Sequence, residues 1–216
     1  MNNPVNAIDP DGKDGVKVID NENKTITIKA NYYVVTTAQN YRQNGSIETL
    51  AGYTDKDIQV MNKYNDFLND LHLEVPSGEY KGYNVVFDLQ FKDGGSPLDT
   101  GLAKDNDLYE GYSIGNSIQR GNEYTHKKMH FEQIINPDGQ TRRVGGVTYN
   151  NEVIIMNTAE DSKMNRIHEI FHTLGFNHPK GSGGNQGIMK YPSRKPTIVD
   201  ALELSETSFL PKIQIR

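Results

Sequence analysis

Residues 168–178 have the sequence His-Glu-Ile-Phe-His-Thr-Leu-Gly-Phe-Asn-His, and this stretch decides which fold the chain can adopt. It overlaps residues 161–174, which we expect to form a helix with one apolar face, because apolar side chains recur at helical spacing: Met164, Ile167, Phe171 and Leu174. His168 and His172 are one helical turn apart, about 6 Å along the axis, so both imidazoles lie on the same side. This separation predicts two nitrogen ligands for one metal ion.

Three further residues of this stretch fit a metal site that acts on a substrate. Glu169 directly follows the first histidine and projects roughly 100° away from it around the helix, so it need not be a ligand and is the candidate catalytic base. Gly175 lets the helix end in a sharp turn, because glycine tolerates a positive φ. The turn returns His178 to the metal as a third ligand. Three neutral nitrogen ligands leave one position of a zinc site open, which is typical of a catalytic zinc.

Composition restricts the classes of protein to which the chain can belong. Its 216 residues suit one domain, or one domain in two lobes. The net charge of -5 and the pI of about 5.7 provide no basic field for a phosphate backbone, so we expect no nucleic acid partner. The chain has no cysteine, so any metal must be held by nitrogen and oxygen ligands. No stretch approaches the ~20 apolar residues of a membrane span, so we expect no membrane insertion.

Local patterns predict alternating strands and helices. Residues 16–19 and 25–28 flank a turn-prone segment and predict a β-hairpin. Residues 54–71 predict a helix with Thr54 and Asp57 as its capping signal. Further strands are expected at 32–37, 83–91, 128–135, 144–149 and 152–157. The last of these is apolar almost throughout, as a strand covered on both faces would be. We also expect a long irregular loop at 93–121 and a terminal helix at 196–210.

The pattern H-E-x-x-H-x-x-G-x-x-H at residues 168–178 resembles the zinc motif of metzincin metallopeptidases. Met189, eleven residues after His178, matches the methionine of the turn that lies beneath the metal in this family. Tyr191 matches the tyrosine of astacin-like and serralysin-like members, which approaches the metal or helps hold the tetrahedral intermediate. The resemblance is specific over residues 166–192. The short glycine-rich spacer before Met189 departs from the family pattern and leaves the subfamily unassigned.

This resemblance implies both a fold and an activity. The fold is α+β, with a twisted mixed β-sheet, a helix and the zinc helix in an upper lobe (about 16–178) and a small irregular lower lobe (about 179–216) with the Met-turn and a C-terminal helix. The activity is that of a zinc (Zn2+) endopeptidase acting on a protein or peptide, which would lie extended along an edge strand upstream of the zinc helix. The implied site residues are His168, His172 and His178 as metal ligands, Glu169 and Tyr191 as catalytic residues, and Gly175 and Met189 as structural residues of the site.

Residues 1–15 carry a second resemblance. The sequence NPVNAIDPDG at residues 3–12 looks like the segment that closes the core of Rhs-repeat (YD-repeat) proteins, before C-terminal domains that are often toxins or effectors. It implies that residues 1–15 are the tail of such a core and residues 16–216 the metallopeptidase domain, with a cognate immunity protein as a further partner. The first fifteen residues contain no apolar segment of a signal peptide, so we expect a secreted or exported domain whose export signal lies outside this chain.

Two alternatives stay open at the level of the sequence. The chain could be a non-catalytic interaction module with a zinc-stabilised fold, which would need a fourth protein ligand or the loss of the base, and the presence of Glu169 argues against it. A peptidase, in turn, could be a toxin released from an Rhs shell or a nutritional or processing protease, and the chain itself does not discriminate between these roles.

Overall fold

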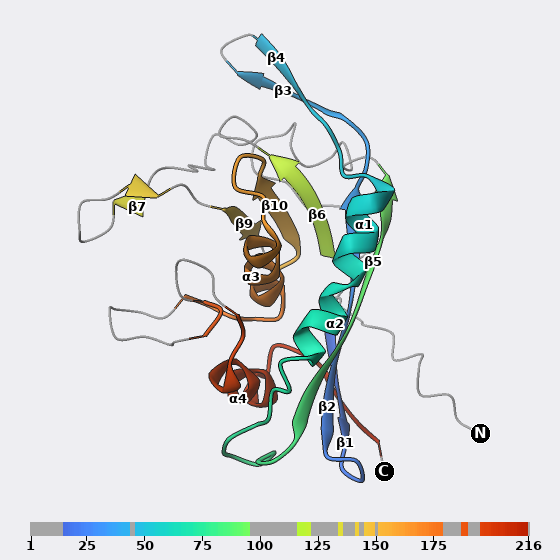
Figure 1. The fold of residues 1–216 in the computed structure, drawn as a ribbon, viewed down its shortest axis with the longest axis vertical. Coiled ribbons are helices and arrows are strands. Elements are labelled where there is room, and N and C mark those ends of the chain that lie inside the picture. The colour runs from blue at the N-terminus through green and yellow to red at the C-terminus, as the bar shows by residue number, and fades with distance from the viewer. Residues whose placement is uncertain are drawn as a thin grey trace.

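A curled mixed β-sheet runs the length of the protein, with helices packed along it (Figure 1). The structure, a computed structural model, describes residues 15–43, 46–95, 116–121, 134–135, 141–142, 145–149, 151–178, 187–189 and 195–215. Residues 1–14, which carry the Rhs resemblance, and Tyr191 therefore lie outside the described residues. The described part mixes helices and strands as the α+β prediction requires.

The predicted N-terminal hairpin forms and starts this sheet. Strand β1 (Gly15–Asp20) pairs antiparallel with β2 (Thr25–Val35), and alternate residues of both strands are buried. The sheet order is β11-β1-β2-β6-β10-β9, and β5 pairs with the opposite edge of β2. The other strands are β5 (Asn84–Gly95), β6 (Asn116–Gly121), β9 (Gly146–Tyr149), β10 (Val153–Asn157) and β11 (Lys212–Ile215). Strands β5 and β6 run parallel to β2, β10 runs parallel to β6, and only β1 and β9 are antiparallel to their inner neighbours.

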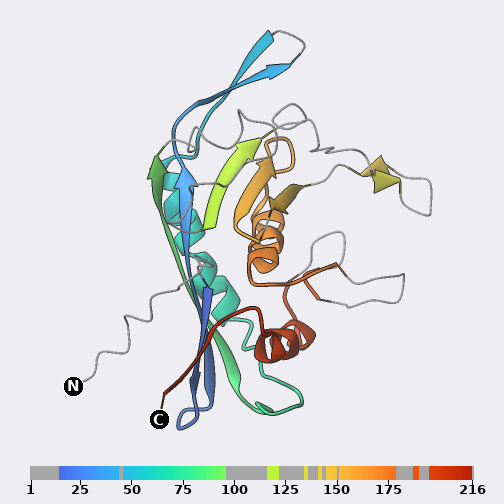
Figure 2. The same cartoon turned by 180° about the vertical axis from the view of Figure 1, so that it is seen from behind.

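Two short hairpins stand apart from the main sheet. Strands β3 (Gln39–Gln43) and β4 (Ser46–Leu50) continue from the end of β2 and project away from the sheet, as Figures 1 and 2 show from opposite sides. Strands β7 (Ile134–Ile135) and β8 (Thr141–Arg142) pair with each other. The strand predicted at 128–135 therefore coincides with the described structure only at β7, and the rest of it lies outside the described residues.

The prediction of one irregular loop over residues 93–121 is wrong at both ends. Residues 93–95 complete β5, and residues 116–121 form β6, an inner strand of the sheet. β6 was missed because it lacks apolar alternation: its buried residues include the polar side chains of Asn116, Ser117 and Gln119. The sequence predicts strand β10 correctly because it is almost wholly apolar, and all five residues of the strand are buried.

The helix predicted at residues 54–71 is two helices. Helix α1 (Asp55–Asn62) begins with the predicted capping box, in which the side chains of Thr54 and Asp57 bond to each other's backbone N–H groups, and Lys63 separates it from α2 (Tyr64–Asn69). The break falls between Asn62 and Asn65, where three helical residues advance about 4.5 Å while two strand residues advance about 6.7 Å. The break between the two helices lets each asparagine side chain lie opposite its partner residue in β5.

Three asparagine side chains close the outer edge of β5. Each accepts a hydrogen bond from the backbone N–H of one strand residue and donates one to the carbonyl oxygen of the same residue, with distances of 2.8–3.1 Å; the pairs are Asn62 with Phe91, Asn65 with Leu89, and Asn69 with Phe87. A paired edge cannot add a further strand. The asparagine side chains therefore occupy the edge at β5. Along the path β5-β2-β6-β10-β9, the edge without a partner strand among the described residues is the outer edge of β9.

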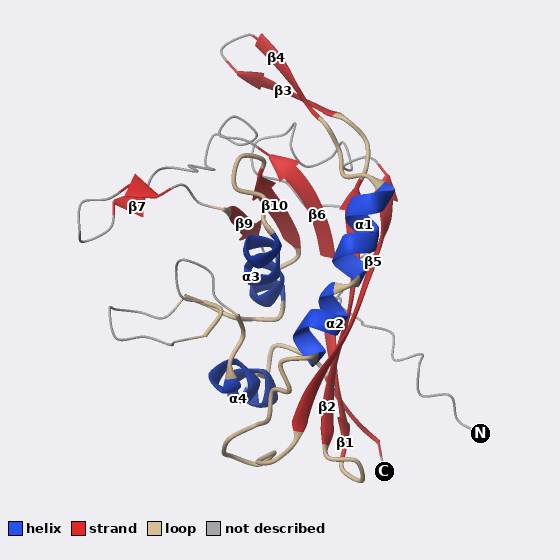
Figure 3. Ribbon diagram, in the orientation of Figure 1, coloured by secondary structure: helices blue, strands red, loops and turns tan. Residues whose placement is uncertain are grey.

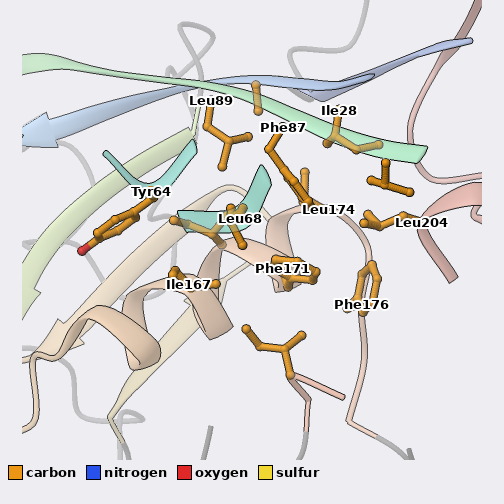
Figure 4. Close-up of a cluster of buried hydrophobic side chains, with 14 of the residues drawn as sticks. Ile28, Tyr64, Leu68, Phe87, Leu89, Ile167, Phe171, Leu174, Phe176 and Leu204 are labelled. Atoms are coloured by element: carbon orange, nitrogen blue, oxygen red, sulfur yellow. The ribbon is translucent and has the colours of Figure 1, made fainter. Parts of the chain in front are cut away.

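The main core lies between the sheet and the helices α2 and α3 (Lys163–Thr173) (Figures 3 and 4). Ile28, Phe87 and Leu89 of the sheet face Leu68 of α2 and Phe171 of α3 in this cluster. The terminal helix α4 (Ile198–Glu206) is shorter than the predicted 196–210, and the chain continues into β11, which was not predicted. No helix in the described ranges has the length and apolar character needed to cross a membrane.

Candidate metal centre

Helix α3 carries the histidine motif and ends where the sequence predicts. Ser162 caps its N-terminus by accepting a hydrogen bond from the backbone N–H of Asn165, at 3.2 Å. At its C-terminus the N–H groups of Gly175 and Phe176 donate to the carbonyl oxygens of His172 and Phe171, both at 3.1 Å, which is a Schellman motif. Gly175 has a φ of +94°, and a Cβ atom there would lie 2.6 Å from the Cβ of Phe209. The turn thus requires glycine for its backbone and for its packing.

All three histidines of the motif present one ring nitrogen to a backbone carbonyl oxygen. The Nδ1 atom of His168 lies 2.8 Å from the oxygen of Ile188, that of His172 lies 2.8 Å from the oxygen of Phe176, and that of His178 lies 3.1 Å from the oxygen of Met189. A carbonyl oxygen only accepts hydrogen bonds, so each Nδ1 carries the proton. In the neutral ring, Nε2 then carries the lone pair that a metal ion needs.

The Nε2 atoms converge. His172 and His178 bring theirs to within 3.2 Å of each other, and one ligand atom from each of the three histidines lies within 4.8 Å of the others. Nitrogens bound to one tetrahedral zinc ion at 2.0–2.1 Å lie roughly 3.4 Å apart. Lone pairs that face one another repel unless a cation lies between them. The three histidines therefore form a group that could hold a metal ion.

Burial keeps the imidazoles of His168 and His172 in the form that binds metal. It lowers the pKa of His168 to about 3, and it also lowers the pKa of His172. Neighbouring histidines act in the same direction, while the hydrogen bonds to Ile188 and Phe176 oppose the shift. Both side chains are thus neutral at pH 7, and no proton has to leave them before a metal ion binds.

Glu169 follows the first of the three histidines on α3 and is not part of the group of ligands. Among the described residues, no carboxylate belongs to the metal-binding group. The side chain is buried, and the hydroxyl of Thr148 in β9 lies 2.8 Å from its Oε2 atom. Burial raises the pKa of Glu169 to about 7, against the opposing effect of that hydrogen bond. Such a carboxyl group can exchange a proton near neutral pH, as a general base must.

Residues 187–189 contact two of the histidines and are hydrogen-bonded to α4. The carbonyl oxygens of Ile188 and Met189 bind two of the histidines, and Met189 itself is buried in the core. Asp200 of α4 is fully buried and accepts the N–H of Ile188 at 3.2 Å as well as the N–H of Thr197 at 2.6 Å. A Cβ atom on Gly187 would lie 2.2 Å from the Asp200 carboxylate, so glycine is needed at this contact.

Of the seven residues predicted for the site, the structure brings together His168, His172 and His178, and the backbone oxygen of Met189 lies against His178. Glu169 lies on the helix that carries two of these histidines, and Gly175 lies in the turn after it. Tyr191 lies outside the described residues. Thr148 and Asp200 were missed. Asp200 could have been found from the capping pattern Thr197-x-x-Asp200, which resembles the one recognised at the start of α1. Nothing local marks Thr148, because its role depends on which face of β9 lies against α3.

Comparisons with protein-family models, with curated proteins and with solved structures find no match for this chain. The function therefore has to be inferred from the geometry of the site.

Proposed function

We propose that this protein is a zinc-dependent endopeptidase of the metzincin type. The observation that carries the proposal is the convergence of one ring nitrogen from each of three histidines, every one of which turns its Nδ1 to a backbone carbonyl oxygen. The helix that carries two of them also carries the buried carboxyl group of Glu169, which is not part of the group of ligands. Three protein ligands are typical of a catalytic zinc, whereas a structural zinc has four. In the described residues no fourth histidine or carboxylate joins the three, which disfavours a purely structural metal.

The arrangement of elements around the site supports this family assignment. A helix lies along a mixed sheet, a fully buried strand, β10, precedes the helix that carries the motif, and that helix ends at a glycine turn. Residues 187–189, which include Met189, precede the C-terminal helix α4 in the chain, and α4 lies below α3 in Figure 1. These are the features that the resemblance predicts for the upper and lower lobes.

The protein's own groups supply the proton transfers of peptide hydrolysis. When bound, zinc supplies Lewis acidity that polarises the scissile carbonyl group and makes water a stronger acid. Glu169 accepts a proton from the attacking water and delivers it to the leaving amine, for which a pKa of about 7 is well matched. The hydrogen bonds from Nδ1 to backbone oxygens fix the tautomer and orientation of the three imidazoles. Tyr191, the proposed oxyanion stabiliser, lies outside the described residues.

Strand β9 is the edge along which an extended peptide would bind. Its inner edge pairs with β10, and no strand of the described residues pairs with its outer edge. Backbone hydrogen bonds to an open strand bind peptides with little dependence on their side chains. A Cβ on Gly146 of this strand would lie 2.8 Å from Cγ of Glu169, so a peptide on the outer edge would run past the base.

Hydrolysis of a peptide library tests the proposal. The wild type, Glu169→Gln and Glu169→Ala are loaded with zinc and adjusted to equal zinc content. The wild type should cleave internal peptide bonds, and both variants should bind zinc but lose several orders of magnitude in rate, because they lack the base. Undiminished cleavage by the variants would refute the role of Glu169.

The Rhs resemblance of residues 3–12 supports an exported effector as the setting of this activity, with a cognate immunity protein as its partner. Production of the domain in the periplasm of a bacterium tests this role. The wild type should arrest growth and Glu169→Ala should not; equal growth of both strains would favour a nutritional or processing protease.

A further inference from the structure

The side chain of Glu169 is fixed by strand β9 at two points. The hydroxyl of Thr148 lies 2.8 Å from the carboxylate oxygen Oε2 and 3.1 Å from the backbone oxygen of the same residue. Two positions earlier, the backbone of Gly146 lies so close to Glu169 that an added Cβ would fall 2.8 Å from Cγ. Residues two apart on a strand share a face. The face of β9 that is turned towards α3 therefore confines both the methylene groups and the carboxylate of Glu169.

The same two residues direct their backbone groups to the open edge. Directly before β9, the carbonyl of Gly145 accepts from the N–H of Asn157 at 2.9 Å, and the register continues within the strand with Val147 opposite Ile155. In an antiparallel ladder, residues whose N–H and C=O point towards the partner strand alternate with residues whose groups point away. Gly146 and Thr148 therefore present their N–H and C=O groups outwards, where a bound peptide would lie.

We propose that Thr148 is a positioning residue, which holds Glu169 by its hydroxyl while its backbone pairs with the bound peptide. The inference rests on the proposed peptidase function. The hydroxyl and the backbone act separately, since the hydroxyl bonds only within the protein and the N–H and C=O groups belong to the edge of the strand. Loss of the hydroxyl should thus misplace the base and leave peptide binding intact.

The test separates kcat from KM in zinc-loaded variants. Thr148→Val removes the hydroxyl at nearly constant volume, and kcat should fall on the order of 10- to 100-fold, the loss typical of a misplaced catalytic group. KM and the zinc content should stay unchanged. Thr148→Ser keeps the hydroxyl and should restore most of kcat. Thr158→Val is the matched control, because its hydroxyl bonds to the carbonyl oxygen of Gly121, and it should leave kcat unchanged.

A second readout does not depend on activity. Thermal unfolding of the metal-free protein is measured for Thr148→Val, Glu169→Ala and the double variant. Thr148→Val should lower Tm more in the wild-type background than in Glu169→Ala, because only the wild type has the carboxylate that the hydroxyl holds, and side chains in direct contact are not additive. The contact of the hydroxyl with the backbone oxygen of residue 169 is present in both backgrounds. Thr148→Ala serves as a second variant without the hydroxyl if Thr148→Val does not fold.

The outcomes distinguish this inference from the function on which it rests. A wild type that hydrolyses peptides together with a Thr148→Val variant of unchanged kcat would overturn the positioning role alone, as would additive changes in Tm. A rise in KM with kcat unchanged would do the same, since it would place the hydroxyl in peptide binding. A zinc-loaded wild type without hydrolytic activity would overturn the peptidase function and the inference together.

Discussion

Glu169 combines two properties that rarely occur together in a stable protein. Its carboxyl group is buried, and the structure provides no cation from a neighbouring side chain among the causes that shift its pKa. Burial raises that pKa from 4.5 to about 7, and only the hydroxyl of Thr148 opposes the shift. Isolated buried carboxyl groups destabilise the folded state once they ionise, and they cluster at functional sites.

The stability of the metal-free protein should reveal this shift. Between pH 4.5 and about 7 the folded state keeps a proton on Glu169 that the unfolded state releases, so the contribution of this residue to the free energy of unfolding falls as pH rises through that window. Glu169→Gln cannot titrate. The difference in unfolding free energy, wild type minus variant, should fall by ~3 kcal/mol across the window in denaturant titrations. The titration of the histidines changes the unfolding free energy of both proteins equally, so it cancels in the difference. A difference independent of pH would contradict the burial of the ionisable group.

For single residues, the sequence predicts the parts of the site that lie within one helix and the turn after it. The spacing of His168, His172 and Glu169 on one helix, and of Gly175 and His178 after it, follows from helical geometry alone. The carbonyl partners Ile188 and Met189 and the hydroxyl of Thr148 come from other segments, so no spacing within the motif indicates them.

Among the elements, the glycine turn after α3 should be sensitive to the smallest substitution. Gly175→Ala should destabilise the fold by ~1–3 kcal/mol through its positive φ, with an added effect from the contact with Phe209, and should weaken zinc binding by displacing His178. Gly82→Ala is the matched control, because Gly82 has a φ of +81° but no atom within 4 Å of an added Cβ. Equal losses of stability and unchanged zinc affinity in both variants would show that the contact with Phe209 is unimportant.

The link between α4 and residues 187–189 leads to a parallel prediction. Asp200→Asn loses one of the two oxygens that accept backbone N–H groups, so the protein should lose ~1–3 kcal/mol of stability and bind zinc more weakly through the turn at Ile188. Asp57→Asn is the control, because Asp57 holds the same capping-box position in α1, away from the metal centre. Calorimetric zinc titration should show weaker binding for Asp200→Asn only. Equal zinc affinities of the two variants would show that Asp200 does not help to position the metal ligands.

Most elements could be predicted because their burial follows their sequence. The hairpin β1–β2 and the helix α3 show the expected periodicity, and β10 is the continuous apolar run that a strand buried on both faces requires. The failures have a common physical reason, which is tertiary context. β6 is an inner strand despite its polar residues, α1 and α2 are separated where three helical residues no longer match two strand residues of β5, and β11 is a strand because β1 offers it an edge.

For the whole molecule, a metal ion would join segments that are distant in sequence. Its ligands come from α3 and the turn after it, the turn at 187–189 orients two of them, and α4 holds that turn. Lys17 of β1 in turn donates to the carbonyl oxygens of Ser205 and Thr207 at the end of α4. Metal binding should therefore stabilise the fold as a unit and not only one helix.

Zinc should raise the thermal stability of the wild type. A ligand at 1,000 times its dissociation constant adds ~4 kcal/mol to the folded state, which corresponds to a rise in Tm on the order of 10 °C for a domain of this size. His178→Ala should keep the metal-free Tm within a few degrees and show a much smaller rise with zinc, because it lacks one ligand. Calorimetric scans with and without zinc measure both quantities. The same rise in both proteins would exclude His178 from the site.

The sequence does not predict which strands of the sheet pair with each other. Periodicity identifies strands one at a time, but it does not show that β6 pairs with β2 or that β5 lies on the opposite edge of β2. Which of the described strands keeps an unpaired edge depends on these pairings and on the asparagines that close β5.

X-ray absorption at the zinc edge of the loaded wild type and of His168→Ala, His172→Ala and His178→Ala tests the metal centre most directly. We expect one zinc ion with three imidazole nitrogens at about 2.0–2.1 Å and one further oxygen ligand that is not from the protein. Each variant should lose one nitrogen from this shell. A closed shell of four protein ligands, or a shell unchanged in the variants, would contradict this expectation.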